Sequence, residues 1–181
     1  MQKFKWLAGT VAIVAAASPA AAEIIDASAS GFTVRETAHL TAAPGAVYAA
    51  LVQPRQWWSG AHSYSGNASN FTFDAKAGGC WCETLPDGGS AMHMTVVYAA
   101  PGKMLRLRGA LGPMQTMGVT GAMTWALQAA GSETDLTLTY TVGGYDKGGF
   151  AELVKAVDGV LHEQMNRLTL YVDTGMPEPQ P

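Results

Sequence analysis

The sequence predicts an α+β fold in which a curved antiparallel sheet wraps around one long C-terminal helix. Two patterns indicate this fold. From Gly149 to Val172, apolar residues recur at steps of three and four, which is the period of an apolar stripe on an α-helix. Between Phe71 and Val142, short segments alternate apolar and polar residues and are separated by glycine- and proline-rich turns. A sheet of about seven strands must bury one face, and the long helix is the available cover.

The elements before this sheet region are one strand and two short helices. Phe32 to Leu40 alternates and is rich in β-branched residues, so it predicts the first strand. Pro44 then begins a short helix that continues to Leu51, because proline is favoured in the first helical turn. Pro54 interrupts this helix, and a second short helical turn follows it. The following segment, Ser59 to Asn70, is rich in glycine, serine and asparagine and is expected to be a loop.

Six further strands are expected, joined by short turns and therefore antiparallel. They cover Phe71 to Ala75, Cys80 to Leu85, Met92 to Ala99, Met104 to Ala110, Val119 to Leu127 and Asp135 to Val142.

The first residues have the pattern of a secretory signal peptide, with a basic start, an apolar run and a small-residue cleavage site ending at Ala22. The apolar run from Leu7 to Ala17 is shorter than the roughly 20 residues that a membrane-spanning helix needs, which argues against the alternative of a retained anchor. We therefore expect a signal peptide at residues 1–22, a flexible lead-in at 23–30, one domain at 31–174 and a frayed tail at 175–181. The mature protein is expected to be exported, either periplasmic or secreted, without stable membrane insertion.

The charge pattern argues against a nucleic-acid partner. The formal net charge is −3, and the largest basic cluster is the Arg106-Leu107-Arg108 segment. A phosphate backbone requires a basic surface that this sequence lacks. No cofactor is expected, because the glycine-rich segments lack the lysine and the serine or threonine of a phosphate-binding loop.

Cys80 and Cys82 lie two apart on a predicted strand, where their Cα atoms would be about 6.5–7 Å apart, at or beyond the limit for a disulfide. Closing the hairpin around Pro86 to Gly89 places Cys82 opposite His93 and both cysteines on the same face as this histidine. The three side chains are a candidate zinc or copper site. The alternatives are two small buried cysteines beside a hydrogen-bonded histidine, or an exposed pair of thiols poised for oxidation. We expect no bound metal, since the sequence offers no fourth ligand.

The opposite face of the hairpin is apolar except for Glu83, and with the helix stripe it could line a cavity. The alternative is a tightly packed core, which is the norm in proteins. The segment from Leu111 to Gly118 reads as a pocket rim or lid, or else as a plain hairpin loop. Gly159, within the long helix, is explained either by close packing on the sheet or by space for a ligand. The candidate ligand-binding residues are Trp57, Trp58, Trp81, Met92, Met94, Met114, Met117, Trp125, Tyr140, Val157 and Leu161.

Catalytic residues are not identified by any known motif. Glu83 and His93 are the candidates for an acid or base, and an enzymatic role stays undecided, with binding favoured. His162 falls on the polar face of the long helix and is expected at the surface.

Several segments together resemble the START-like (SRPBCC) helix-grip superfamily, nearest to its branch of polyketide cyclases/dehydrases and heat-shock-protein ATPase activator homologues. They are the Ala43 to Leu51 helix, Trp57-Trp58, Gly78-Gly79-Cys80-Trp81, the Pro101 to Leu105 turn and the long C-terminal helix. The resemblance implies the helix-grip fold. The functions found in this superfamily include carriers of hydrophobic molecules, cyclases and chaperone co-factors, and the resemblance does not choose among these functions.

The sequence thus favours an exported domain that binds a small hydrophobic molecule of lipid, polyketide or aromatic type between sheet and helix, without chemistry. One alternative is a cyclase- or hydrolase-like enzyme that uses Glu83 or His93 as acid or base. The other is a protein-interaction domain with no small ligand.

Overall fold

A computed structural model describes residues 20–178 of the chain. The predicted signal peptide therefore lies almost entirely outside the described residues. Within them, the fold is α+β, with one antiparallel sheet and a long C-terminal helix, as the sequence predicts. The strands are β1 (Ala21–Ala27), β2 (Gly31–Leu40), β3 (Phe71–Phe73), β4 (Cys80–Thr84), β5 (Ser90–Ala100), β6 (Met104–Arg108), β7 (Gly118–Ala130) and β8 (Glu133–Tyr145).

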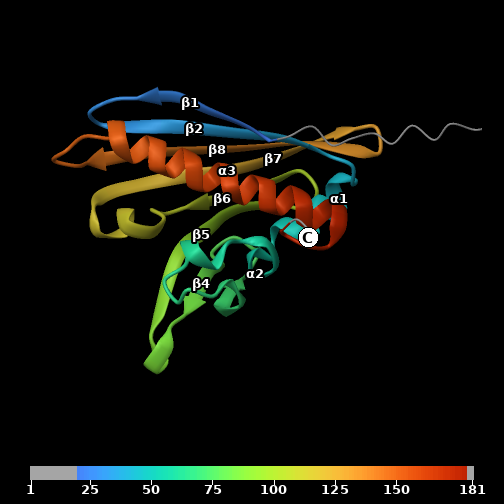
Figure 1. The fold of residues 1–181 in the computed structure, drawn as a ribbon, viewed down its shortest axis with the longest axis horizontal. Coiled ribbons are helices and arrows are strands. Elements are labelled where there is room, and N and C mark those ends of the chain that lie inside the picture. Colours follow the sequence, from blue (N-terminus) through green and yellow to red (C-terminus); the bar gives the residue numbers. More distant parts are fainter. Residues whose placement is uncertain (1–19, 179–181) are drawn as a thin grey trace, which may run out of the picture.

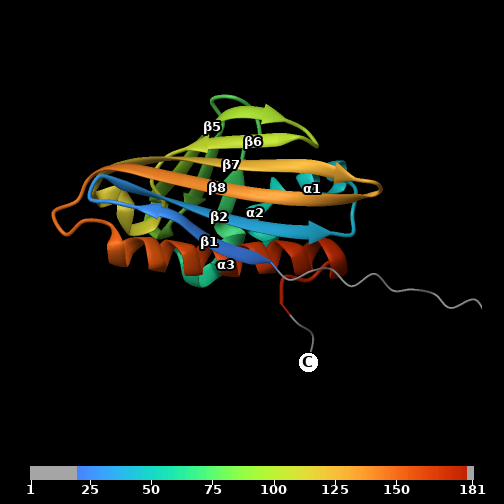
Figure 2. The same ribbon diagram turned by 90° about the horizontal axis from the view of Figure 1, so that it is seen from above.

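The sheet order is β1-β2-β8-β7-β6-β5-β4-β3, so the meander from β3 to β8 is joined at its end by β2. The helices are α1 (Pro44–Leu51), α2 (Pro54–Trp57) and α3 (Ala151–Thr174). Figure 2 shows α3 running along one side of the sheet. Figure 1 shows β4 and β5 running at a steep angle to β1 and β2, so the sheet is strongly twisted.

The apolar stripe of α3 is buried against the sheet, as its period predicts. Val154, Leu161, Met165 and Leu168 are each at most 3% exposed and belong to one cluster with the inward-facing residues of the strands. Fully burying such a side chain stabilises the fold by about 1.5–3 kcal/mol. The helix is therefore held by packing.

The sheet has eight strands rather than about seven, because β1 forms where a flexible lead-in is expected. Ala21 pairs with Thr37 and Ala27 with Phe32, which places β1 at the sheet edge. All seven β1 residues are exposed, so the strand is held mainly by backbone pairing and has no apolar alternation to predict it. The predicted cleavage point after Ala22 lies inside this strand.

Gly159 is exposed, and a Cβ atom at this position would meet nothing within 4 Å. Neither close packing on the sheet nor space for a ligand accounts for it, so both sequence-based explanations are wrong.

We expect the Gly159→Ala substitution to raise the free energy of unfolding by about 0.5–1 kcal/mol. Alanine is favoured over glycine by this amount in a helix interior, and here it costs no steric strain. Urea unfolding at an unchanged m value measures the gain. A loss of stability would contradict a regular helix with free space around this position.

The polar face of α3 is only partly solvated. Gln164 is fully buried, and its Oε1 accepts a hydrogen bond of 2.8 Å from the Ser59 amide. His162, expected at the surface, is half-exposed, with its Nδ1 3.0 Å from Oε2 of the buried Glu36 on β2. The period of the helix does not reveal these contacts, because the polar partners come from distant segments.

Across residues 20–178, none of the helices combines the length and the hydropathy needed to cross a bilayer.

Candidate functional site

A cavity of about 450 Å³ lies between the first half of α3 and the β4–β5 end of the sheet. Its walls come from α3, from the segment after α2, from three strands, and from the loop between β6 and β7. Most of the lining residues are apolar. They are Leu153, Ala156, Val157, Val160 and Leu161 of α3, then Trp58, Ala61, His62, Ser63 and Tyr64, then Phe71, Trp81 and His93 of the strands, and Leu111, Gly112, Pro113 and Met114 of the loop.

The structure brings part of the predicted ligand-binding set to this cavity. Trp58, Trp81, Met114, Val157 and Leu161 line it. The others lie elsewhere: Trp57, Met94, Trp125 and Tyr140 are buried in the surrounding core, Met117 is partly buried, and Met92 is 59% exposed.

Several lining residues were not predicted. Leu153 and Val160 belong to the same helical stripe as Val157, which the sequence predicts to face either the core or a cavity. Residues 61–64 have no periodic pattern, and only the fold brings them to the cavity. Residues 111–113 belong to the segment predicted as a pocket rim, and they do line the cavity.

A β-bulge in the β4–β5 hairpin determines which side chains face the cavity. Cys80 pairs with Thr95 and Trp81 with Met94, as expected, but Cys82 pairs with Met92, so His93 is an extra residue in β5. His93 and Met94 are therefore both buried, whereas Met92 turns outward. The predicted pairing of Cys82 with His93 is wrong, and so is the predicted inner position of Met92.

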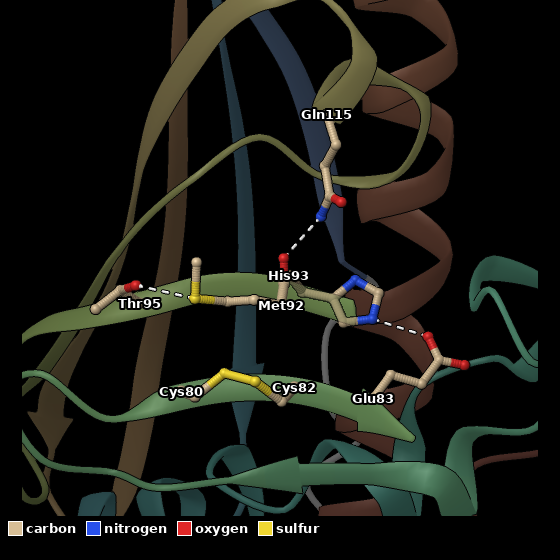
Figure 3. The surroundings of a disulfide bond; sticks show 7 residues. All are labelled: Cys80, Cys82, Glu83, Met92, His93, Thr95 and Gln115. Atoms are coloured by element: carbon tan, nitrogen blue, oxygen red, sulfur yellow. Dashed lines mark hydrogen bonds and ion pairs between the residues drawn. A yellow bond between two sulfur atoms is a disulfide. The ribbon is translucent and has the colours of Figure 1, made fainter. Parts of the chain in front are cut away.

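Cys80 and Cys82 form a disulfide, contrary to the sequence-based expectation. Their Cα atoms are 5.4 Å apart, closer than in a regular extended strand, at the same step of the ladder as the bulge. Figure 3 shows the disulfide on β4, away from the His93 ring. The candidate metal set of Cys80, Cys82 and His93 is therefore not assembled. Residues 20–178 contain no group of three His, Cys, Asp or Glu side chains arranged to hold a metal ion.

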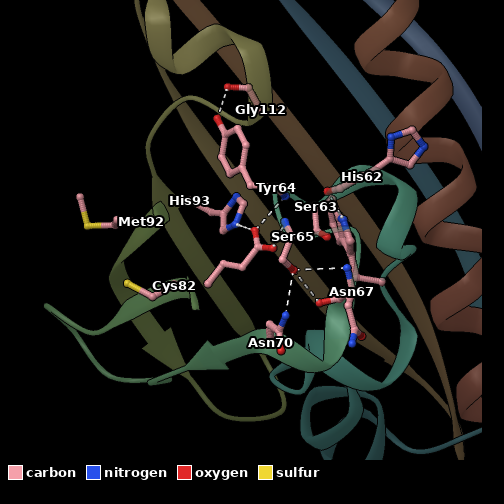
Figure 4. A network of polar contacts seen from close by, with 12 residues as sticks. His62, Ser63, Tyr64, Ser65, Asn67, Asn70, Cys82, Met92, His93 and Gly112 are labelled. Atoms are coloured by element: carbon pink, nitrogen blue, oxygen red, sulfur yellow. Dashed lines mark hydrogen bonds and ion pairs between the residues drawn. The ribbon is translucent and has the colours of Figure 1, made fainter. Parts of the chain in front are cut away.

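The bulge brings the two candidate acid/base residues into contact. His93 Nε2 lies 2.9 Å from Glu83 Oε2, and the Glu83 side chain is fully buried (Figure 3). Glu83 also accepts hydrogen bonds from the backbone amides of Tyr64, at 3.0 Å, and Ser65, at 2.6 Å. Figure 4 shows Tyr64, Ser65 and His93 close to one another. Glu83 thus anchors the segment after α2 to the sheet and orients His93.

Burial alone would raise the pKa of Glu83, but hydrogen bonds from Ser65, Tyr64 and His93 outweigh it and lower the pKa below its usual value. Burial lowers the pKa of His93, and the hydrogen bond to Glu83 offsets only part of this effect. The pair is therefore an ionised carboxylate beside a neutral imidazole. Glu83 is not among the residues that line the cavity, whereas His93 is.

The loop between β6 and β7 forms the cavity rim and is tied down at several points. It contains a short 3-10 helix at Gly112–Thr116. The buried Tyr140 hydroxyl donates to the Gly109 carbonyl and accepts from the Leu111 amide. The Tyr64 hydroxyl donates to the Gly112 carbonyl at 2.8 Å, and Gln115 donates to the Met92 carbonyl at 2.9 Å (Figures 3 and 4). These contacts support the prediction of a pocket rim over that of a plain hairpin loop.

Comparisons with known proteins agree with this architecture. A search of curated protein sequences finds no significant match. Among solved structures, an uncharacterized protein of Rhizobium leguminosarum is 20% identical with a TM-score of 0.58, and the match covers 86% of this chain and 98% of that one. The Aha1 dimer of Colwellia psychrerythraea is 15% identical with a TM-score of 0.57, covering 79% and 97% of the two chains. CalU16 of Micromonospora echinospora is 14% identical with a TM-score of 0.54, covering 89% and 88%.

These structural likenesses establish the fold. The family is established separately, because residues 31–173 match the sequence model described as polyketide cyclase/dehydrase and lipid transport. The chain therefore belongs to the polyketide cyclase/dehydrase and lipid transport family.

Proposed function

We propose that this protein binds a small, mainly apolar molecule in the cavity between the sheet and α3 and releases it unchanged. The observation that carries the proposal is the cavity itself. Its volume of about 450 Å³ falls in the usual range of small-molecule sites, about 300–1,000 Å³, and its walls are mostly apolar. Protein interiors are otherwise closely packed, so an apolar space of this size favours an apolar guest. The family description, which includes lipid transport, supports the same class of function.

The signal-peptide pattern of residues 1–22 extends the proposal to the localisation of the protein. If the chain is exported, it binds its ligand in the periplasm or outside the cell. Mass spectrometry of the N-terminus of the protein recovered from the producing cells tests this point. A chain that begins at Met1 and stays in the cytosolic fraction would contradict export.

We expect the purified protein to bind the neutral apolar fluorophore N-phenyl-1-naphthylamine, and the Ala156→Trp substitution to weaken binding at least tenfold. Ala156 lies on α3 and lines the cavity, so an indole at this position would occupy the space that the ligand needs. Ala151→Trp is the matched control, because Ala151 and Ala156 are both exposed on α3 but Ala151 does not line the cavity. Fluorescence titration measures both affinities.

Equal weakening by both tryptophans would contradict the proposed site. If no apolar probe binds the wild-type protein, a protein-interaction domain without a small ligand would be favoured instead.

Acid/base catalysis is the second candidate function, favoured by the contact between Glu83 and His93. In such an enzyme His93 would contact the substrate, and Glu83 would position its ring. The lining has three further polar side chains, His62, Ser63 and Tyr64, but most of the wall is apolar, including all of its α3 residues. Binding therefore accounts better for the site. Mass spectrometry of a bound compound distinguishes the two functions, since a carrier returns it unchanged and an enzyme changes its mass or structure.

A further inference from the structure

Among the described residues, three side chains of the cavity wall carry a polar atom without a hydrogen-bond partner, namely His62 at Nδ1, Trp81 at Nε1 and His93 at Nδ1. The His62 side chain is 33% exposed, so water can serve its Nδ1. Trp81 Nε1 is fully buried, so a ligand in the cavity does not reach it.

The His93 side chain is 5% exposed and lines the cavity, and its Nε2 is engaged by Glu83. Within residues 20–178, no hydrogen bond reaches its other ring nitrogen, Nδ1. Figure 3 shows this nitrogen on the side of the ring that points away from Glu83. Nδ1 is not one of the fully buried unpaired atoms of the described residues, so it is accessible from the cavity, and the donor group of a ligand can pair with it.

The pairing with Glu83 fixes what Nδ1 can do. An ionised carboxylate only accepts hydrogen bonds, so the ring must place its hydrogen on Nε2. Burial in apolar surroundings opposes a second proton on the ring and lowers the pKa of His93. Nδ1 is therefore a bare acceptor, and its ligand partner must be a donor.

The surroundings of the ring restrict the ligand further. Tyr64 stacks on His93 with ring centroids 5.5 Å apart, and the rings of Phe71 and Trp81 lie 5.2 and 5.6 Å away. Flat aromatic groups suit such a wall, because aromatic pairs gain from stacked and edge-on contacts.

Charge excludes two classes of ligand. The ionised Glu83 behind His93 repels a carboxylate ligand, and among the described residues no lysine or arginine lines the cavity to pair with one. An ammonium group would have to lose its hydration among apolar walls. A neutral hydroxyl group on an aromatic ring avoids both costs.

We propose that the cavity selects neutral aromatic molecules that carry a hydroxyl group, and that His93 Nδ1 accepts the hydrogen bond of that hydroxyl. The inference rests on the proposed binding function and names its ligand class. His93 is the specificity-determining residue, and Glu83 positions its ring.

Displacement of N-phenyl-1-naphthylamine by three matched compounds tests the proposal at pH 7.5. We expect 2-naphthol to bind about three- to tenfold more tightly than 2-methoxynaphthalene, the range that one net hydrogen bond provides. We expect 2-naphthoic acid, which is ionised, to bind more weakly than either. If no compound binds, the proposed function itself fails. If 2-naphthol and 2-methoxynaphthalene bind equally, the binding function stands and the inference is wrong.

The His93→Phe variant tests whether His93 causes the preference for 2-naphthol over 2-methoxynaphthalene, because phenylalanine keeps an aromatic ring and removes the hydrogen-bond acceptor. We expect the variant to bind 2-methoxynaphthalene normally and to lose the preference for 2-naphthol. His62→Phe is the matched control, since His62 also lines the cavity, with its Nε2 directed to Glu163. The control should keep the preference, and loss of the preference in the control alone would overturn the assignment.

A measurement on the wild-type protein keeps the test valid if His93→Phe does not fold. The ¹⁵N resonance of His93 Nδ1 should move on addition of 2-naphthol, because accepting a hydrogen bond changes the shielding of that nitrogen. 2-Methoxynaphthalene should leave it in place. An unchanged Nδ1 resonance in the presence of saturating 2-naphthol would contradict the proposal.

Discussion

Replacing Glu83 by alanine is expected to lower the free energy of unfolding by about 3–5 kcal/mol, because three donors lose a buried acceptor and each unsatisfied buried group costs about 1–3 kcal/mol. The carboxylate accepts hydrogen bonds from the Tyr64 and Ser65 amides and holds His93, and its side chain is fully buried. Alanine leaves these donors without a partner in the protein. Because they join the segment after α2 to the sheet, the cavity wall should loosen as well, and apolar probes should bind more weakly.

The effect of Glu83→Ala should depend on pH. The pKa of Glu83 is lower in the folded protein than its ordinary value of 4.5, so its contribution is present above pH 4.5 and is lost as the pH falls through the folded pKa. The difference between wild type and variant should therefore shrink in acid.

Urea unfolding of both proteins at pH 7 and pH 3 measures this change. Glu152→Ala is the control, since Glu152 is exposed on α3 and, among the described residues, pairs with Lys155 alone. Its effect should stay within about 0.5 kcal/mol. A Glu83→Ala variant as stable as this control would show that the buried network does not hold the site together.

Replacing Glu36 by glutamine is expected to make the protein more stable at pH 8 by about 1–3 kcal/mol, with little change at pH 4.5. Glu36 is fully buried between β2 and α3, and burial raises its pKa to about 7 although His162 hydrogen-bonds to it. The charge of Asp158 raises the pKa of Glu36 further. Among the described residues, Glu36 Oε1 has no hydrogen-bond partner, so the ionised form is poorly accommodated.

The direction in which the free energy of unfolding changes with pH follows from proton binding to Glu36. Between pH 4.5 and about 7 the folded protein retains a proton on Glu36 that the unfolded chain releases. Stability from this residue is therefore complete below pH 4.5 and is lost as the pH rises through about 7. Glutamine is neutral at every pH and removes the decline.

Chemical denaturation from pH 4.5 to pH 8 measures the slope. Glu23→Gln, on the exposed edge strand β1, is the control and should keep the wild-type slope. A Glu36→Gln variant that still loses stability with rising pH, or that is less stable at pH 8, would contradict the assigned protonation of Glu36.

The repeating patterns of the sequence predict most of the fold. The helical period of α3 and the alternation in β7 and β8 both report the burial of one side of an element, which is a local property of the chain. The edge strand β1 has no buried side, so alternation could not reveal it. The partners of His162 and Gln164 lie far away in sequence and could be found only from the fold.

The site was harder to predict for a related physical reason. Counting residues along a hairpin assumes a regular ladder, and the single extra residue at His93 reverses the faces of His93 and Met92. Beside this bulge, the Cα atoms of Cys80 and Cys82 on β4 are 5.4 Å apart, closer than the regular strand assumed in the prediction. Glu83 and His93 were both candidates, but their contact depends on this bulge. Tyr64 and Ser65, which complete the network, carry no local signal.

Chemical-shift mapping of backbone amides with 2-naphthol tests the central claim, an apolar binding cavity between the sheet and α3, most directly. We predict shifts that saturate at one equivalent and concentrate around Tyr64, His93, Leu153 and Val157, which lie on different walls of the cavity. The β1 edge and the last turn of α3 should not respond. No saturable shifts, or shifts spread over the outer face of the sheet, would contradict the account.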